Sequence, residues 1–262
     1  MNPHPASTAT VPGNSKTSVV VLGYPVDRVT MDEAVDRCRS YLHGDRRARL
    51  VVTLNAAVLA MAERCERLRS AVRGGDLVLA DGISVVWAAR LFGADLRHRV
   101  SGVDLMERLA QLADGEGLRI FFLGARPEVV LKVVDRIESE HPGVVVAGFR
   151  DGYFAPSEAG EVIEQVRRSR ADILFVAMPS PFKEIWCFDH LDDLGVPVVL
   201  PVGGAFDVFS GEIPRAPVWM RNAGLEWSWR LLMEPRQKWR RYLFLNSAFV
   251  WLCLRSVVLK RR

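Results

Sequence analysis

Polar residues follow several short apolar runs in this sequence, at points where the strands of a parallel sheet are expected to end. Asp81 ends the run DLVLAD and is followed by a glycine. Thr53 and Asn55 close another run, VVTLN. Ligands of open α/β sheets bind beyond the carboxyl ends of the strands. These three side chains are therefore the first candidates for contact with a substrate.

Asp81 has two interpretations. Its carboxylate can cap a helix that begins near Ile83 by accepting a free backbone N–H group. It can also act as a general base toward a hydroxyl group, a role that contributes roughly 10²–10⁴ in rate. The sequence leaves both open. For Asp104, which follows RVSGV, we keep the interpretation as a helix cap.

Three glycine turns follow other predicted strands, near Gly124, Gly152 and Gly203–Gly204. Such turns let backbone N–H groups approach a ligand, and two of them open helices, where phosphate is favoured. Turn geometry alone also explains a glycine after a strand. Neither GxGxxG nor the Walker A motif occurs in the chain. The remaining polar candidates at strand ends are Asp151, Lys183, Glu184 and Asp207.

No DxD pair is present, so the usual carboxylate clamp that holds a nucleotide diphosphate through a metal ion is missing. Arginines and backbone N–H groups would have to meet the charge of a bound diphosphate. The candidate arginines are Arg99, Arg126, Arg215, Arg221 and Arg230. The last three lie among apolar and aromatic residues, where an idle charge is costly. Histidines and cysteines show neither HxxxH nor CxxC spacing, so we predict no metal site.

The elements that must position these residues alternate between short apolar runs and amphipathic segments. Runs such as IFFLGA and ADILFVAM are apolar throughout, which is typical of strands covered on both faces. The alternation predicts an α/β fold, a Rossmann-like parallel sheet with helices on both faces. SVVVLGYPV is expected to be the first strand, and AAVLAMAERCERLRSAVRGG a single helix.

Composition divides the 262 residues into three predicted segments. Residues 1–16 are rich in Pro, Ser, Thr and Asn and are expected to form a disordered tail. Residues 17–210 are predicted to form an α/β domain that contains the candidate catalytic residues, and residues 211–262 a C-terminal helical appendage. The appendage has eleven Lys/Arg and three Asp/Glu, a net charge of +8, whereas the first 210 residues carry −4. This asymmetry predicts a polyanionic partner for the appendage.

The appendage also concentrates tryptophan, with four of the chain's seven in residues 215–242. Its longest uncharged run, Tyr242 to Leu254, has thirteen residues, whereas a bilayer span needs about 20. A basic segment with tryptophans and aliphatic residues fits a helix that lies in the interface of an anionic membrane. Packing on its own domain or within a homo-oligomer is the alternative. Nucleic acid is disfavoured, because a groove that follows the nucleic-acid backbone does not need a long aliphatic run.

The chain resembles the WecG/TagA/CpsF glycosyltransferase family, glycosyltransferase family 26, across roughly residues 20 to 245. The matching blocks are TLN, LADGISVV, RVSGVDLM, FFLGARPEVV, SPFKE, VGGAFDVFSGEIPRAP and GLEWSWRLLMEPRQKWRRY. The resemblance implies an inverting enzyme that needs neither metal nor cofactor. It would move a sugar, such as N-acetylmannosamine or its uronic acid, from a UDP donor to a sugar on undecaprenyl diphosphate. It would act at the cytoplasmic face of the membrane, in teichoic acid, capsule or exopolysaccharide synthesis.

Motif matching also implies roles for individual residues. Asp81 matches the candidate base, which would deprotonate the acceptor hydroxyl as it attacks the anomeric carbon. Thr53 and Asn55 would line the same pocket and orient sugar hydroxyls. Arg99 would face a donor or acceptor phosphate.

The remaining matched positions are implied to bind the nucleotide diphosphate. The turn at Gly203–Gly204 and Asp207 would lie near the nucleotide. The appendage would close over the diphosphate with Arg215, Arg221 and Arg230. One position departs from the family, which commonly has Pro-x-Gln-Glu where this chain has PFKE. Lys183 thus replaces a neutral amide by a cation, which suggests an acidic sugar, a phosphate contact or another subfamily.

Two other functions compete with a glycosyltransferase. One is a Rossmann-type oxidoreductase or nucleotide-sugar epimerase, against which the missing GxGxxG and the missing Tyr-x-x-x-Lys argue. The other is a membrane scaffold that binds lipid diphosphate without catalysis. The sequence alone leaves the scaffold open.

Overall fold

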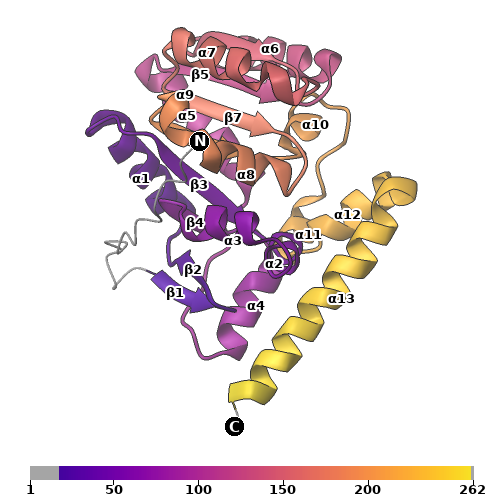
Figure 1. The fold of residues 1–262 in the computed structure, drawn as a ribbon. Helices are drawn as coiled ribbons and strands as arrows, with labels where there is room; N and C mark the ends of the chain where they lie inside the picture. Colours follow the sequence, from indigo (N-terminus) through magenta and orange to yellow (C-terminus); the bar gives the residue numbers. More distant parts are fainter. Residues whose placement is uncertain (1–17, 261–262) are drawn as a thin grey trace.

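The structure is a computed structural model that describes residues 18–260, without the side chains of residues 222, 236–238, 240–242, 259 and 260. The tail predicted for residues 1–16 lies outside the described residues. Figure 1 shows an α/β body with one long helix along its outer side.

The centre of the body is a six-stranded sheet in which every pair of neighbours is parallel. Its strands, in spatial order, are β4 (Leu77–Ala80), β3 (Arg49–Leu54), β8 (Val198–Pro201), β7 (Ile173–Ala177), β5 (Arg119–Gly124) and β6 (Val145–Arg150). The predicted parallel α/β sheet is confirmed. Because the strands are parallel, all their carboxyl ends lie at one edge of the sheet.

Alternate residues of the strands feed two separate cores, one on each face of the sheet. Leu50 and Val52 belong to one core, whereas Val51 between them belongs to the other. This alternation follows from the two-residue period of a strand. The helices of the body that contribute to the first core are α2 (Ala56–Ala62), α3 (Glu66–Arg73), α4 (Ile83–Leu91), α7 (Ala159–Ser169), α8 (Phe182–Asp189) and α9 (Leu191–Leu194), and Phe249 near the C-terminus also belongs to it. Those of the second core are α1 (Met31–His43), α5 (Gly102–Glu116), α6 (Pro127–Glu140) and α10 (Ala205–Phe209). A short 3₁₀ turn, η1 (Pro156–Glu158), precedes α7.

The expected first strand is instead a separate antiparallel hairpin. It consists of β1 (Ser18–Val21) and β2 (Tyr24–Asp27), which pair with each other and with no strand of the large sheet. Leu22 and Gly23 between them both have positive φ, 52° and 85°. Such a two-residue turn matches the twist of a hairpin. The apolar run therefore folds back on itself, and β3 is the first strand of the parallel sheet.

The single helix expected after Asn55 is two helices, α2 and α3, separated by Glu63–Cys65. The Tyr24 hydroxyl of the hairpin donates to Glu63 Oε1 at 3.0 Å. This tertiary contact lies at the interruption, where the local sequence is compatible with helix throughout.

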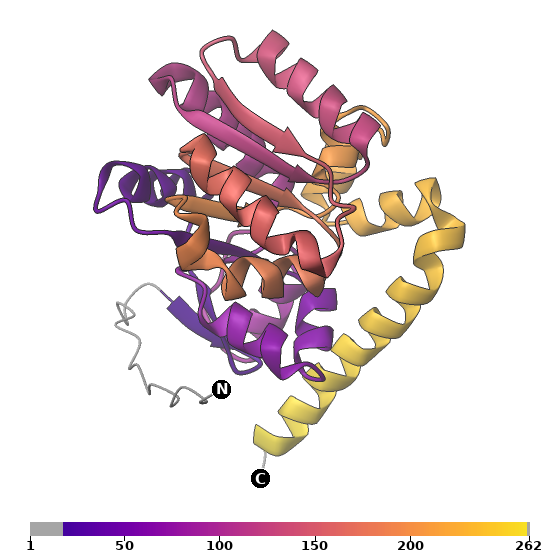
Figure 2. The same cartoon turned by 45° about the horizontal axis from the view of Figure 1, so that its top comes forward.

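The predicted helical nature of the C-terminal segment is confirmed. It contains α11 (Val218–Asn222), α12 (Glu226–Met233) and α13 (Pro235–Lys260). With 26 residues, α13 is about 39 Å long. It lies along α2, and Figures 1 and 2 both show it, in yellow, on the outside of the body. Among the described residues, no helix combines the length and the apolar character that crossing a bilayer requires.

Candidate active site

Asp81 follows β4 directly, and its carboxylate connects two elements of the body. Its backbone N–H donates to Leu54 O of the neighbouring strand at 2.9 Å. The cap residue of α4 is Gly82, so Asp81 does not take the capping role. Asp81 Oδ1 instead accepts from the backbone N–H of Gly102, at the start of α5, at 3.1 Å. The carboxylate is thereby held between α4 and α5 at the carboxyl edge of the sheet.

Thr53 and Asn55 lie at the end of β3, next to β4. Thr53 is 6% exposed, and its hydroxyl is 3.4 Å from Pro201 O of β8. Asn55 caps α2, because its Oδ1 accepts from Val58 N at 3.1 Å. A Cβ added to Gly82 would lie 3.5 Å from Asn55 Cβ, so this side chain packs against the loop that carries Asp81.

The environment of Asp81 makes its carboxyl group more basic than usual. Its pKa is raised, mainly because burial removes water from the carboxylate and then because Glu226 brings a second negative charge. Arg99, the Gly102 N–H group and Arg230 oppose this rise and favour the ionised form. A raised pKa suits a general base that must take a proton from a sugar hydroxyl.

Asp104 gathers arginines from the body and from the C-terminal segment. Arg215 donates a hydrogen bond to Asp104 Oδ1, and Arg221 Nη1 lies 3.8 Å from the same oxygen. Arg99 Nη2 lies 3.9 Å from Asp104 Oδ2, and Arg99 Nη1 lies 3.3 Å from Glu226 Oε2. Burial, together with the nearby charge of Arg221, lowers the pKa of Arg215. Three arginines thus share the carboxylate of Asp104, and Glu226 is a second partner of Arg99.

The structure thereby adds two residues to the sequence-predicted set, Asp104 and Glu226. We expected Asp104 to cap α5, and the cap residue is Ser101. No sequence motif singled out Glu226. Only the position of the two acids in the sequence could have indicated their role. Each lies in a matching block that also contains a candidate arginine, RVSGVD for Asp104 and GLEWSWR for Glu226.

The C-terminal segment contacts the site at two glycines. Gly224, between α11 and α12, has φ +72°, and an added Cβ would lie 2.2 Å from Ile83 at the start of α4. At Gly204, after β8, an added Cβ would lie 2.6 Å from Arg230 Nη1 and 3.4 Å from Asp207 Oδ2. Arg230 and Asp207 therefore both approach the Gly203–Gly204 turn. These close contacts place α11 and α12 over the carboxyl edge formed by β4, β3 and β8.

Lys183 lies in the same region, but its charge is already compensated. Lys183 and Glu184 are 6% and 1% exposed, and Lys183 Nζ forms an ion pair with Glu184 Oε1. Ser180 Oγ also donates to Glu184 Oε1, at 2.7 Å. The stem of Lys183 runs beneath Gly203, with Cε 3.2 Å from the position of an added Cβ. A cation paired in this way is a weaker candidate for reading an acidic sugar than the sequence suggested.

Gly124 and Asp151 lie at the other side of the carboxyl edge. Asp151 follows the edge strand β6, five strands away from β4, which corresponds to about 24 Å. Its Oδ1 accepts from Tyr153 N at 2.8 Å and closes a local turn. Gly124 has φ +121°, and an added Cβ would lie 2.4 Å from Ala177 O. Turn geometry explains both residues, and neither is brought together with Asp81.

Two further groups are separate from the site. Arg126 is half exposed and pairs with Glu128 at 2.8 Å and with Glu212 at 3.6 Å.

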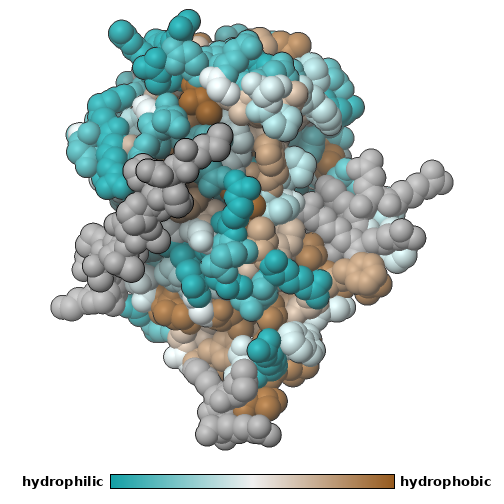
Figure 3. Space-filling view, in the orientation of Figure 1, coloured by the Kyte–Doolittle hydropathy of each residue, from teal (hydrophilic) through white to brown (hydrophobic). Residues whose placement is uncertain are grey.

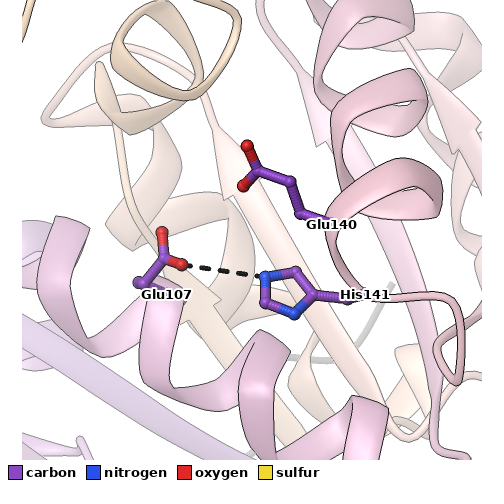
Figure 4. A group of neighbouring side chains, drawn as sticks. All are labelled: Glu107, Glu140 and His141. Carbon is purple, nitrogen blue, oxygen red and sulfur yellow. Dashed lines mark ion pairs between the residues drawn. The ribbon is translucent and has the colours of Figure 1, made fainter.

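Within the part of the chain that the structure describes, one group of acids and histidine is close enough to share a metal ion, drawn in Figure 4. It comprises Glu107, Glu140 and His141. His141 Nε2 lies 3.7 Å from Glu107, and Arg136 donates to Glu140 at 2.9 Å, so ion pairs account for this arrangement.

Comparison with known proteins identifies relatives of this chain. The chain is 35% identical over 204 residues to an N-acetylglucosaminyldiphosphoundecaprenol N-acetyl-beta-D-mannosaminyltransferase of Bacillus spizizenii, covering 78% of each chain. It is 34% identical over 194 residues to the enzyme of the same name from Bacillus subtilis, covering 74% of this chain and 75% of the relative. Residues 19–262 match the glycosyl transferase WecG/TagA/CpsF family along nearly the whole chain. The chain belongs to this family of glycosyltransferases.

Proposed function

We propose that the protein transfers N-acetylmannosamine, or a closely related sugar, from a UDP donor to a sugar on undecaprenyl diphosphate. The names of the two Bacillus relatives support the sugar and the N-acetylglucosamine acceptor. The proposal rests on one observation. Asp81, a carboxylate with a raised pKa, lies in the same site as arginines from both the body and the C-terminal segment. The product would enter a cell-surface polymer such as teichoic acid, capsule or exopolysaccharide.

In the proposed reaction, Asp81 takes the proton of the acceptor hydroxyl. The hydroxyl oxygen forms a bond to the anomeric carbon of the donor from the face opposite UDP. The bond from that carbon to the UDP oxygen breaks, and its electron pair leaves with UDP, so the configuration is inverted. Thr53 and Asn55 lie next to Asp81 and would orient sugar hydroxyls, Asn55 through its Nδ2 group.

The arginines would bind the donor diphosphate and stabilise UDP as it leaves. Arginine is suited to this because its planar guanidinium group binds phosphate oxygens in a bidentate manner. Arg99, Arg215 and Arg221 meet at Asp104, and Arg230 lies over the Gly203–Gly204 turn. A diphosphate between these groups would relieve the repulsion among them, which favours binding of substrate over an empty site.

We further propose that residues 211–262 attach the protein to the anionic cytoplasmic face of the membrane. Trp219, Trp239 and Trp251 are each about half exposed or more, and α13 contains several Lys and Arg but no Asp or Glu. Interfacial helices combine tryptophan with positive charge in this way. The same segment would then complete the active site where the lipid-linked acceptor resides. Assembly into a homo-oligomer stays a prediction.

The test is release of UDP from a panel of UDP-sugars, with an undecaprenyl-diphosphate-GlcNAc acceptor in liposomes. We expect acceptor-dependent release that persists in EDTA and that is lost in Asp81→Asn. Release that is equal in wild type and Asp81→Asn would contradict the role of Asp81. Retained acceptor binding without any turnover would favour the scaffold function instead. NAD in the purified protein would favour the oxidoreductase or epimerase.

A further inference from the structure

Helix α4 exposes two large apolar side chains that the body would be expected to bury. Trp87 is 58% exposed and Leu91 is 61% exposed. They are four residues apart, so they lie on one face of the helix, with Arg90 beside them. The opposite face is buried, as Val85 and Val86 show. Helix α4 is therefore amphipathic with an outward apolar face, although it belongs to the catalytic body and not to the C-terminal segment.

The C-terminal half of α13 presents a similar outward face. Four of its large exposed side chains recur at helical spacing, namely Val250, Trp251, Leu254 and Val258, each between 55% and 62% exposed. The Arg255 guanidinium lies over the Trp251 ring, 5.5 Å from its centroid. On the other side of α13, Phe249 is buried and Cys253 packs against the same core that contains Val85 and Val86 of α4. Both helices thus use one shared core and turn their other faces outward.

These outward faces gather at one end of the molecule. In Figure 1 the C-terminal ends of α4 and α13 both lie at the lower end, and Figure 3 shows hydrophobic side chains, in brown, around that end. We name the set the α4–α13 surface. It comprises Trp87, Leu91, Val250, Trp251, Leu254 and Val258. Exposed apolar side chains that gather on one part of a protein mark a binding surface.

Charge decides what this surface binds. Arg90 and Arg255 lie among its apolar residues, Lys260 ends α13, and α13 contains no Asp or Glu. A second copy of the chain would bring like charges together, which opposes association. An anionic lipid membrane offers both an apolar interior and negative headgroups. Tryptophans are enriched at the depth where these two regions of the bilayer meet.

We propose that α4 of the catalytic body docks on the membrane together with α13, so that one lipid-facing surface includes both helices. The proposal rests on the proposed function, because it explains how the base reaches a lipid-linked acceptor. Asp81 precedes α4 by two residues, and α4 rises about 12 Å from Ile83 to Leu91. Docking through Trp87 and Leu91 holds the active site within about one length of α4 of the membrane surface. Attachment through α13 alone would leave that distance undetermined.

The test compares two double variants of the full chain. Trp87→Gln/Leu91→Gln removes the apolar face of α4. Leu131→Gln/Phe149→Gln is the matched control, because these side chains are 45% and 41% exposed on α6 and β6, at the opposite edge of the sheet. Binding is measured by co-sedimentation with phosphatidylglycerol-containing vesicles. We expect the α4 variant to bind roughly tenfold more weakly and the control to bind like wild type.

Activity then separates this proposal from the proposed function. With a short-chain, water-soluble lipid-diphosphate acceptor, we expect the α4 variant to be as active as wild type, which also shows that it is folded. With the undecaprenyl acceptor in vesicles, its activity should fall in parallel with binding. Wild-type inactivity on both acceptors would refute the proposed function while leaving vesicle binding to decide the role of α4.

Wild-type vesicle binding by the α4 variant would overturn the proposal. So would a decrease in molecular mass in solution upon substitution without any change in vesicle binding, since the surface would then join two copies of the chain. If the double variant does not fold, the single variants Trp87→Gln and Leu91→Gln serve in the same comparison. Each is expected to weaken vesicle binding by a few-fold.

Discussion

The two halves of the sheet end differently at the carboxyl edge, although both are built from the same parallel strands and covering helices. Beyond β4, β3 and β8, the C-terminal segment closes over the edge, bringing Arg230 near Asp81 and Arg215 and Arg221 to Asp104. Beyond β5 and β6, the chain closes on itself in short turns at Gly124 and Asp151. The end of a strand is thus a place where a site can form, and a second element that covers it determines whether charged groups gather there.

Charge balance shows the same difference. In the first half, Arg99, Arg215 and Arg221 share the carboxylate of Asp104, with Glu226 as an additional partner of Arg99. In the second half, two arginines near strand ends, Arg126 and Arg150, are each paired with two glutamates. Arginines that share their acidic partners remain available to an anionic ligand, whereas arginines with two acidic partners each are already compensated, so the first half is the more favourable place for such a ligand.

The largest expected effect separates Asp81 from Asp151, the aspartates that follow the two edge strands of the sheet. Asp81→Asn keeps the shape of the side chain and removes the base, so we expect turnover to fall by roughly 10²–10⁴. Asp151→Asn is the matched control and should retain activity, because Asp151 closes only a local turn. Steady-state release of UDP measures both. Equal losses of turnover in the two variants would contradict the difference between the two halves of the sheet.

A smaller loss of activity is expected when the arginines lose the Asp104 carboxylate that they share. In Asp104→Asn, Arg215 and Arg221 keep their charge, so they still attract a diphosphate, but they are no longer held in place. Charged hydrogen bonds contribute about 1.5–3 kcal/mol, which corresponds to roughly 10- to 150-fold. We expect this loss in kcat, with little change in the KM for the UDP-sugar.

The control for Asp104 is on the same helix. Asp114 of α5 accepts from Gly143 N at 2.6 Å and contacts none of the arginines at Asp104. Asp114→Asn should lower the melting temperature and leave kcat unchanged. If Asp104→Asn affected only the melting temperature, a merely structural role for Asp104 would follow.

Gly124→Ala tests whether the turns of the second half of the sheet stabilise the fold without binding substrate. Alanine at φ +121° is strained, and its Cβ would lie 2.4 Å from Ala177 O, so we expect a loss of about 1–3 kcal/mol in the free energy of unfolding. Kinetic constants of the folded fraction should not change. Gly115→Ala in α5 is the control, since its added Cβ would meet no atom within 4 Å apart from its chain neighbours and the nearby backbone of its own helix. It should be neutral or slightly stabilising. A raised KM for the UDP-sugar in Gly124→Ala would instead place a ligand at this turn.

The smallest effect is a change in pH dependence. Glu226 raises the pKa of Asp81, so Glu226→Gln should lower that pKa. A base acts in its deprotonated form, and the rising acid limb of kcat/KM should therefore move to lower pH in the variant. Glu128→Gln, which removes a partner of Arg126 in the second half, should leave the limb in place. A shift to higher pH in Glu226→Gln would contradict the electrostatic link between Glu226 and Asp81.

The sequence predicted much of the fold because its patterns are local. Alternating apolar and amphipathic runs identified the parallel sheet and the helical C-terminal segment. Errors arose where a backbone turn or a distant contact intervened. The turn at Leu22–Gly23 made a hairpin of the expected first strand, and the contact from Tyr24 to Glu63 accompanies the break between α2 and α3.

For the candidate site, the sequence by itself determined which residue types follow each strand and which segment is basic and rich in tryptophan. Only the tertiary structure decided that Asp104 and Glu226 pair with the arginines, that Glu184 compensates the charge of Lys183, and that Asp151 and Asp81 follow opposite edge strands of the sheet. The physical reason is that periodicity reports the burial of a residue within its own element. The order of strands in the sheet and the path of the C-terminal segment depend on packing between distant parts of the chain, and these set which charges meet.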